Sequence, residues 1–344
     1  MTRLWGKDYS RTELLQRIGS LSQVGGVEAM TLDDGPERGV RALRLRGGDL
    51  DCTVLPDRCM DISNLTWSGR SLCWHSGTGR VSPELIHLED NGFARSFFGG
   101  MLTTCGLDNF GPGCVDEGVR RYQHGLIHNA PAANVSWGER WDGDRCTLFA
   151  TGTMRQNRLF GENLTLARTI EMDLGGDAIR LHDVVTNDGW EPEPYLLTYH
   201  INVGFPLLDD GAQIRGSFAA VEPRDSVAAA GTDGWDQLQG PQPHFKEQVF
   251  LVTPQPAADG RAEAGLWNPA LEGGLGLRLR WDIATLPWLV VWRQLGQGAY
   301  VVGLEPTSCR VITGRAQARA ANALPTLEPG EERHFTLEFA VVTA

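Results

Sequence analysis

Apolar and polar residues alternate with a period of two along much of the chain. Leu43 and Leu45 alternate with arginines, and Leu50, Cys52 and Val54 alternate with polar residues. The same alternation recurs over residues 170–174, 179–185, 275–281 and 335–339. Because successive side chains of a strand point to opposite faces, these segments predict β-strands with one buried face.

A tight turn joins two of these predicted strands. Gly175, Gly176 and Asp177 separate the alternating segments 170–174 and 179–185. Glycine and aspartate favour the backbone conformations that a short antiparallel connection requires. We therefore expect a β-hairpin here.

One helix is predicted near the start of the chain. Ser10 and Glu13 have the spacing of a capping box. The apolar residues that follow recur at helical spacing, at Leu14, Leu15, Ile18 and Leu21. Gly25 and Gly26 then end the segment. The pattern predicts a helical cap within residues 1–26, lying on the edge of a sheet.

The remaining patterns indicate fold class and domain organisation. Strands and helices do not alternate regularly, which disfavours a parallel sheet with crossover helices. Residues 206–270 are rich in Ala, Asp, Gly and Pro, so we expect long loops there. No segment has the composition of a linker. We expect an all-β fold, a large antiparallel β-sandwich in a single domain over residues 1–344.

Composition excludes several classes of partner. The formal net charge is -12 and no run of basic residues is present, which argues against nucleic-acid binding. Because neither a signal-peptide pattern nor a stretch of membrane-spanning length is present, we expect a cytoplasmic protein without a membrane partner. Seven cysteines without a C-x-x-C pattern indicate reduced thiols rather than disulfides or a metal site.

Two segments place acid–base groups beside apolar strands. His200 and Asn202 are two apart, so a strand presents both on one face. An imidazole exchanges protons near neutral pH, although a half-buried His bonded to the backbone fits the pattern equally. Glu305 follows an apolar run and precedes a proline. Partial desolvation there raises the pKa of a carboxyl towards the range of a general base; an ordinary ion-paired Glu is the alternative.

A second histidine region does not fit a metal site. His124 and His128 are four apart, but Gly125 follows the first and Pro131 is close. Both residues disfavour the helix that would align two such histidines on one metal ion. The eleven Trp residues fit either core packing or stacking on sugar rings.

Several short motifs resemble the aldose 1-epimerase (galactose mutarotase-like) superfamily. The similarity is greatest to its branch labelled aldose 1-epimerase family protein, also classed as a domain of unknown function. The motifs are D-R-C-M-D-I at 57–62, F-F-G-G-M-L-T-T-C-G-L at 97–107, H-G at 124–125, Y-H-I-N-V-G-F-P at 199–206, W-R at 292–293, G-L-E-P at 303–306 and L-E-P-G-E at 327–331. Their order and spacing cover nearly the whole chain.

This resemblance implies a galactose mutarotase-like sandwich that interconverts the α and β anomers of an aldose. Glu305 would remove the proton of the anomeric hydroxyl, and His200 would protonate the ring oxygen. His124 would help to hold the sugar, and Asn202 would bind a hydroxyl. The implied partner is a small-molecule sugar, no cofactor or metal is required, and a homodimer is left open.

One substrate-binding motif of the family is missing. Characterised galactose mutarotases carry an Asn–Arg pair before the first histidine region, whereas residues 99–107 contain no Arg here. The residues that could supply polar or stacking contacts instead are Arg58, Asp61, Asp108, Trp292 and Arg293. Arg58 and Asp61 could equally form a structural ion pair with each other. The preferred sugar is therefore not predicted.

Two other functions remain compatible with the sequence. A hydrolase or lyase on the same fold would need a second carboxylate about 5–10 Å from Glu305, which Asp61 or Asp108 would have to supply. A sugar-binding module would need an aromatic platform but no acid–base pair.

Overall fold

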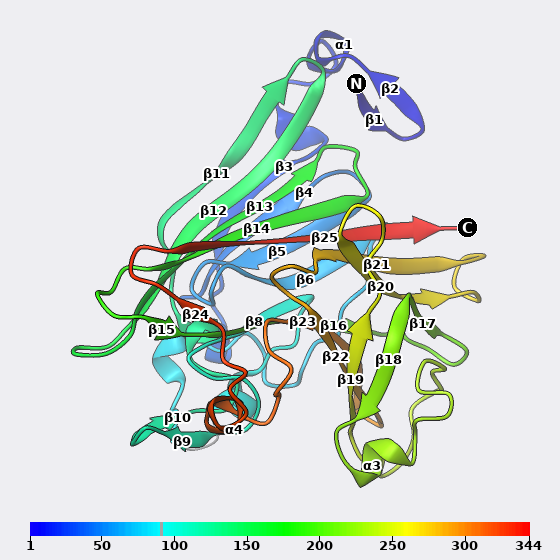
Figure 1. The fold of residues 1–344 in the computed structure, drawn as a ribbon. Helices are drawn as coiled ribbons and strands as arrows, with labels where there is room; N and C mark the ends of the chain where they lie inside the picture. The colour runs from blue at the N-terminus through cyan, green and yellow to red at the C-terminus, as the bar shows by residue number, and fades with distance from the viewer. Residues whose placement is uncertain (90–91) are drawn as a thin grey trace.

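Antiparallel sheets form the body of the protein in the computed structural model, which describes residues 1–89 and 92–344. The largest sheet, which is visible in Figure 1, has eight strands. Their spatial order is β11 (Ala133–Asp142), β12 (Arg145–Asn157), β13 (Asn163–Asp173), β14 (Ala178–Asn187), β25 (Glu332–Thr343), β21 (Leu275–Asp282), β20 (Arg261–Asn268) and β17 (Gln213–Gly216). Every pairing in it is antiparallel.

Two further sheets complete the sandwich. The six-stranded sheet has the order β18 (Phe218–Pro223), β19 (Gln248–Pro254), β22 (Trp288–Gly296), β23 (Ala299–Thr307), β16 (Leu196–Gly204) and β8 (Leu102–Leu107). The five-stranded sheet has the order β3 (Gly26–Thr31), β4 (Arg41–Arg46), β5 (Leu50–Leu55), β6 (Asp61–Trp67) and β7 (Arg70–Ser71). The expected all-β antiparallel sandwich is confirmed.

The smaller elements lie at the ends and edges of these sheets. Three two-stranded ribbons pair β1 (Thr2–Leu4) with β2 (Lys7–Tyr9), β9 (Cys114–Asp116) with β10 (Val119–Arg121), and β15 (Glu193–Pro194) with β24 (Thr326–Leu327). The α-helices of the described residues are α1 (Arg11–Leu15), α2 (Gly92–Ser96), α3 (Ser226–Ala229) and α4 (Arg315–Ala320). Within residues 1–89 and 92–344, no helix has the length and apolar character needed to cross a bilayer.

The strands predicted from alternation are present. In the predicted hairpin, Met172 on β13 pairs with Ile179 on β14, and the turn lies between them. Side chains of all three large sheets meet in one apolar core, to which Leu166, Val54 and Ile201 each contribute from a different sheet. Since about 25 cal/mol is gained per Å² of apolar surface buried, this shared core holds the layers together.

The N-terminal helix is shorter than the sequence pattern predicts. Its capping box is present, because Ser10 accepts a hydrogen bond from the backbone of Glu13 and Glu13 accepts one in return. The helix ends at Leu15, however, so the expectation of a helix reaching Leu21 is wrong. Gly19 is a poor helix former, and the extended backbone at Ser20 caps a separate 3₁₀ turn over Leu21–Gln23.

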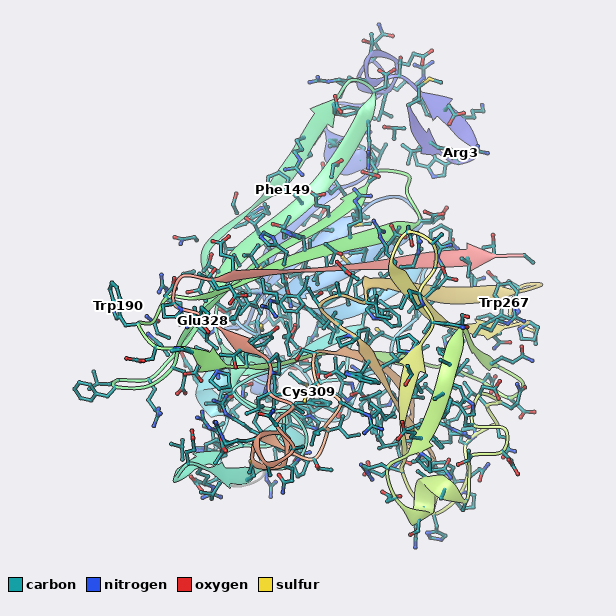
Figure 2. The ribbon with its side chains drawn as sticks, in the orientation of Figure 1. Arg3, Phe149, Trp190, Trp267, Cys309 and Glu328 are labelled. Atoms are coloured by element: carbon teal, nitrogen blue, oxygen red, sulfur yellow. The ribbon has the colours of Figure 1, made fainter. Side chains whose placement is uncertain are left out.

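Strand β16 is buried at every position, unlike the outer strands. Alternating burial, as in β12, shows a strand with one face in solvent. In β16 one face meets the core, and loops cover the other. Cys309 lies in the interior on this covered side, whereas Trp190 projects into solvent (Figure 2). All seven cysteines are free. The covered face is where the candidate site lies.

Candidate functional site

Two neighbouring strands bring the predicted acid and base together. Ile201 on β16 pairs with Leu304 on β23, so His200 and Glu305 are directly opposite each other. The Nε2 atom of His200 is 3.2 Å from Oε1 of Glu305. Both side chains are almost completely buried. Residues 105 positions apart in sequence therefore form one acid–base pair.

A pocket of about 600 Å³ opens above this pair. Its aromatic lining consists of Trp74, Phe93, Phe97, Phe110 and Trp292. Its polar side chains are Ser76, Gln123, His124, His200, Arg224, Glu247, Glu305 and Thr313. An apolar cavity with a few converging polar groups is the usual form of a small-molecule site.

Burial sets the protonation of the pair. It raises the pKa of Glu305 well above the ordinary range, and the negative charge of Glu247 acts in the same direction. Burial also lowers the pKa of His200 to about 3, with a smaller contribution from His124. The pair therefore holds one proton on the carboxyl, and the imidazole is neutral.

His124 lies on the same side of the pocket as His200. The two ring centroids are 6.1 Å apart, and Phe93 and Phe110 pack against the His124 ring at 4.4 and 5.2 Å. Burial lowers the pKa of His124 to about 4. Within the described chain, Nδ1 of His124 and Nδ1 of His200 are buried without a hydrogen-bond partner. Such unpartnered groups are rare in proteins unless a ligand or water reaches them.

The glycine of the H-G motif lets the chain approach closely. Gly125 has a φ of +73°, and a Cβ at this position would lie 2.1 Å from the carbonyl oxygen of Gly106. His124 donates its backbone N–H to the carbonyl of Gly111, and its own carbonyl accepts from the N–H of Gly106. The motif thus fixes the histidine against the end of β8.

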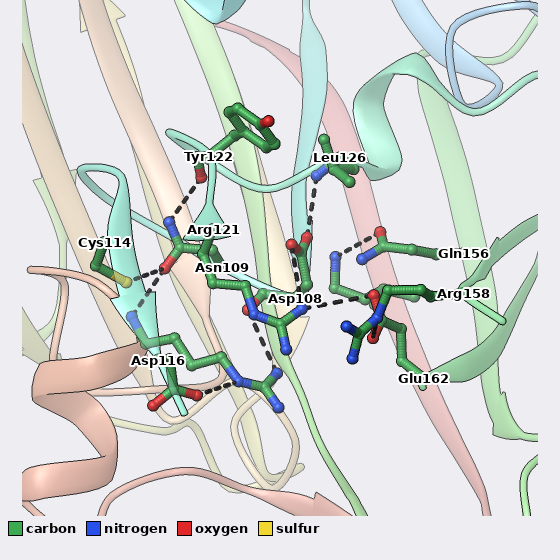
Figure 3. A network of polar contacts seen from close by, with 12 residues as sticks. Asp108, Asn109, Cys114, Asp116, Arg121, Tyr122, Leu126, Gln156, Arg158 and Glu162 are labelled. Atoms are coloured by element: carbon green, nitrogen blue, oxygen red, sulfur yellow. Dashed lines mark hydrogen bonds and ion pairs between the residues drawn. The ribbon is translucent and has the colours of Figure 1, made fainter. Parts of the chain in front are cut away.

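A buried polar network holds the loop that carries His124 (Figure 3). Asn109 donates to the carbonyl of Tyr122 at 2.7 Å and accepts from the backbone N–H of Arg315 at 2.8 Å. Asp108 accepts from the backbone N–H of Leu126 at 3.1 Å and lies 3.6 Å from Arg121. Asp108 and Asn109 therefore form hydrogen bonds to the backbone on both sides of His124. Asp108 does not line the pocket itself.

Asp61 and Arg58 also lie outside the pocket. Asp61 accepts hydrogen bonds from Arg168 at 2.8 Å and from the hydroxyl of Thr104 at 2.6 Å. Arg58 donates to the carbonyls of His128, Val81 and Ser96. The two residues are thus bonded to other groups rather than to each other, and both serve the structure of the surrounding chain.

Asn202 and Arg293, the last two expected contact residues, form hydrogen bonds to the backbone of the protein itself. Asn202 donates to the carbonyls of Gly99 and His200. Arg293 donates to the carbonyl of Trp235 at 2.7 Å. Neither side chain lines the pocket. Of the seven contact residues predicted from sequence, His124 and Trp292 are the two at the pocket.

Several polar or aromatic pocket residues escaped the sequence analysis, among them Trp74, Arg224 and Glu247. Glu247 accepts a hydrogen bond from Nε1 of Trp292 and another from Arg224, both at 3.1 Å. Trp74 packs its ring edge-on against Trp292 at 6.5 Å. Arg224 directly follows β18 and Glu247 directly precedes β19, so opposite charges flank two paired strands. That flanking pattern is the sequence signal that points to Arg224 and Glu247.

No cluster of three or more His, Cys, Asp or Glu side chains suited to a metal ion occurs in the part of the chain that the structure describes.

The chain matches one family model and several solved structures. A family model described as Domain of unknown function (DUF4432) matches residues 37–341. The structure is similar to that of a candidate aldose 1-epimerase from Klebsiella pneumoniae subsp. pneumoniae MGH 78578, with a TM-score of 0.85, 26% identity and coverage of 92% of this chain and 83% of the other. No curated protein matches in sequence.

More distant structures share the fold alone. A galactose mutarotase-like protein from Clostridium acetobutylicum matches with a TM-score of 0.62, 14% identity and coverage of 92% of this chain and 98% of that one. A galactose 1-epimerase from Lactobacillus acidophilus NCFM matches with a TM-score of 0.57, 11% identity and coverage of 92% and 98%.

Proposed function

We propose that this chain, which belongs to the family described as Domain of unknown function (DUF4432), is a carbohydrate isomerase that interconverts the α and β anomers of an aldose. The observation that carries the proposal is the contact between His200 and Glu305 at the floor of the pocket. The fold shared with aldose 1-epimerase-like proteins supports it.

The chemistry needs two proton transfers at neighbouring oxygens. Opening a cyclic hemiacetal removes the proton of the anomeric hydroxyl and adds one to the ring oxygen. Both oxygens are bonded to the same carbon, so an acid and a base 3.2 Å apart can reach the two of them. A positioned acid or base contributes roughly 10²–10⁴-fold to such a rate.

The pair supplies both groups from its single proton. When that proton moves from Glu305 to His200, a carboxylate and an imidazolium face the sugar. Glu305 then accepts the hydroxyl proton while His200 donates to the ring oxygen, and the bond between the anomeric carbon and the ring oxygen breaks. The open aldehyde rotates about its C1–C2 bond. Reclosure with the roles reversed gives the other anomer and restores the pair.

The rest of the pocket positions the ring. His124 lines the pocket beside His200, where its ring can bond a sugar hydroxyl. The indole of Trp292, whose centroid is 5.4 Å from that of His200, offers an apolar face to the C–H side of a sugar. Holding the ring in this way keeps its two reacting oxygens over the acid–base pair.

Anomer exchange across a panel of aldoses tests the proposal. Exchange rates are measured by polarimetry and by NMR saturation transfer for the wild type, Glu305→Gln and the control Glu332→Gln, whose carboxyl is exposed. We expect one or more aldoses to exchange faster with the wild type, a loss of at least about 100-fold in Glu305→Gln, and no change in the control. Equal rates for the wild type and Glu305→Gln would refute the acid–base role.

A glycoside hydrolase or lyase is the second candidate, because the pocket contains another carboxylate. Asp61 and Asp108 lie outside the pocket, but Glu247 lines it and its charge raises the pKa of Glu305. Release of reducing ends from glycosides, lost in both Glu305→Gln and Glu247→Gln, would favour this reaction. Sugar binding that survives Glu305→Gln, without any anomer exchange by the wild type, would instead favour a binding module.

A further inference from the structure

The charges around the pocket limit which sugars it accepts. The titratable side chains among its lining residues are His124, His200, Arg224, Glu247 and Glu305. Both histidines are neutral near pH 7, because burial lowers their pKa values to about 4 and about 3. Arg224 is therefore the one permanent cation among the described residues that line the pocket.

Two acidic groups already engage that cation. Nε of Arg224 donates to Asp225 at 2.8 Å, and one terminal nitrogen donates to Glu247 at 3.1 Å. A guanidinium binds a phosphate or carboxylate best when it offers two parallel N–H groups. In Arg224 the Nε–Nη2 edge is engaged by Asp225 and Glu247. The two carboxylates together also carry more charge than the single arginine.

Glu247 is held with its carboxylate at the pocket. Its second oxygen accepts from Nε1 of Trp292, so both oxygens are anchored while the side chain stays about half exposed. A carboxylate oxygen accepts more than one hydrogen bond, and sugar hydroxyls are suitable donors. The aromatic faces of Trp74 and Trp292 are also electron-rich and repel anions.

The same carboxylate acts on the acid–base pair. The negative charge of Glu247 raises the pKa of Glu305, in addition to the larger effect of burial. An anionic group on a bound sugar would act in the same direction and oppose formation of the Glu305 carboxylate. An anionic substrate is therefore disfavoured both in binding and in the chemical step.

We infer that the pocket takes neutral aldoses, and that Glu247, anchored by Arg224 and Trp292, is the residue that accepts their hydroxyls and rejects sugar phosphates and uronic acids. This inference rests on the proposed function for its kinetic readout only.

The experiment compares matched neutral and anionic sugars. The probes are glucose, galactose, their 6-phosphates, glucuronate and galacturonate. Binding is followed by quenching of tryptophan fluorescence, since Trp74 and Trp292 line the pocket, and anomer exchange is followed by NMR. The variants are Glu247→Gln, which keeps an acceptor for Trp292, and the control Glu222→Gln, whose carboxyl is exposed and bonded to Arg310 outside the pocket.

We expect the wild type and the control to prefer the neutral member of each set by tenfold or more, and Glu247→Gln to reduce that preference to about threefold or less. A wild-type preference for the phosphates or uronic acids, a ratio unchanged by Glu247→Gln, or the absence of binding by every neutral sugar overturns the inference. If neutral sugars bind selectively but no anomer exchange occurs, the isomerase proposal fails while the assignment of Glu247 stands.

Discussion

The two faces of strand β16 differ in how completely their buried polar groups are bonded. On the core face, Tyr199 donates its hydroxyl to Asp183 at 2.8 Å. Arg168 lies beside them, and its five N–H groups reach Asp183, Asp61, Thr104 and the carbonyl of Cys59. On the pocket face, His200 contacts Glu305 but leaves Nδ1 without a partner in the described structure.

This difference indicates that the core face of β16 serves stability and that its pocket face serves function. A fully bonded buried network has no capacity left for a ligand, so its members stabilise the sandwich. A buried histidine and a buried glutamate with spare hydrogen-bonding capacity cost stability, and that cost is typical of binding and catalytic sites. Adjacent residues, Tyr199 and His200, should therefore respond to mutation in opposite ways.

The largest effect on stability is expected from Arg168→Met. This change leaves Asp61 and Asp183 as buried carboxylates without their cation, at a cost of about 3–5 kcal/mol in the free energy of unfolding. Urea denaturation measures the loss. The control Arg155→Met removes an exposed arginine 3.7 Å from Asp188 and should change stability by less than about 1 kcal/mol. Equal effects of the two variants would contradict the distinction between the faces.

Apart from Glu305→Gln, the variant expected to lose the most activity is His200→Asn. Loss of the proton donor should reduce the rate of anomer exchange by about 100-fold or more. The free energy of unfolding should stay within about 1 kcal/mol of the wild type, because the polar contact that is lost is the one between His200 and Glu305. An inactive variant that is also unfolded would leave the role of His200 indistinguishable from that of Arg168 and would count against this prediction.

Tyr199→Phe, one residue away, should show the reverse pattern. Removal of the hydroxyl deletes a charge-assisted hydrogen bond to Asp183 and should cost about 1.5–3 kcal/mol of stability. Anomer exchange by the folded variant should change less than about threefold, because the ring points away from the pocket. A large loss of rate at full stability would show that the two faces are coupled.

Most of the sandwich could be predicted from sequence because its signal is local. The alternation at 170–174 and 179–185 specifies a hairpin, and the capping box at Ser10 specifies where α1 begins. The length of α1 was not predictable in the same way. Leu21 keeps the helical spacing, but it lies in a separate 3₁₀ turn beyond the end of α1 at Leu15, so the apolar period alone overestimates the length of the helix.

The site was only partly predictable because its members are joined by the fold rather than by spacing. Motifs identified His200 and Glu305, which strand pairing then brings to 3.2 Å. The D-R-C-M-D-I motif suggested a sugar contact for Asp61, yet its partner Arg168 lies 107 positions away, which no local pattern reveals. Glu247 lies in the segment expected to form loops, and its place beside Trp292 depends on the register of β19 against β22.

The smallest expected effect is a shift in the pH profile of Glu247→Gln. The active pair holds one proton. The rate of anomer exchange should therefore fall at low pH, where protonation of His200 gives the pair a second proton, and at high pH, where Glu305 loses the single proton of the pair.

The negative charge of Glu247 raises the pKa of Glu305. Its removal lowers that pKa, so the high-pH limb should move to lower pH by a fraction of a unit. The low-pH limb, governed chiefly by burial of His200, should move less. Rates from pH 3 to 10 for the wild type, Glu247→Gln and Glu222→Gln measure both limbs, and a high-pH limb that moves upward contradicts the assigned interaction.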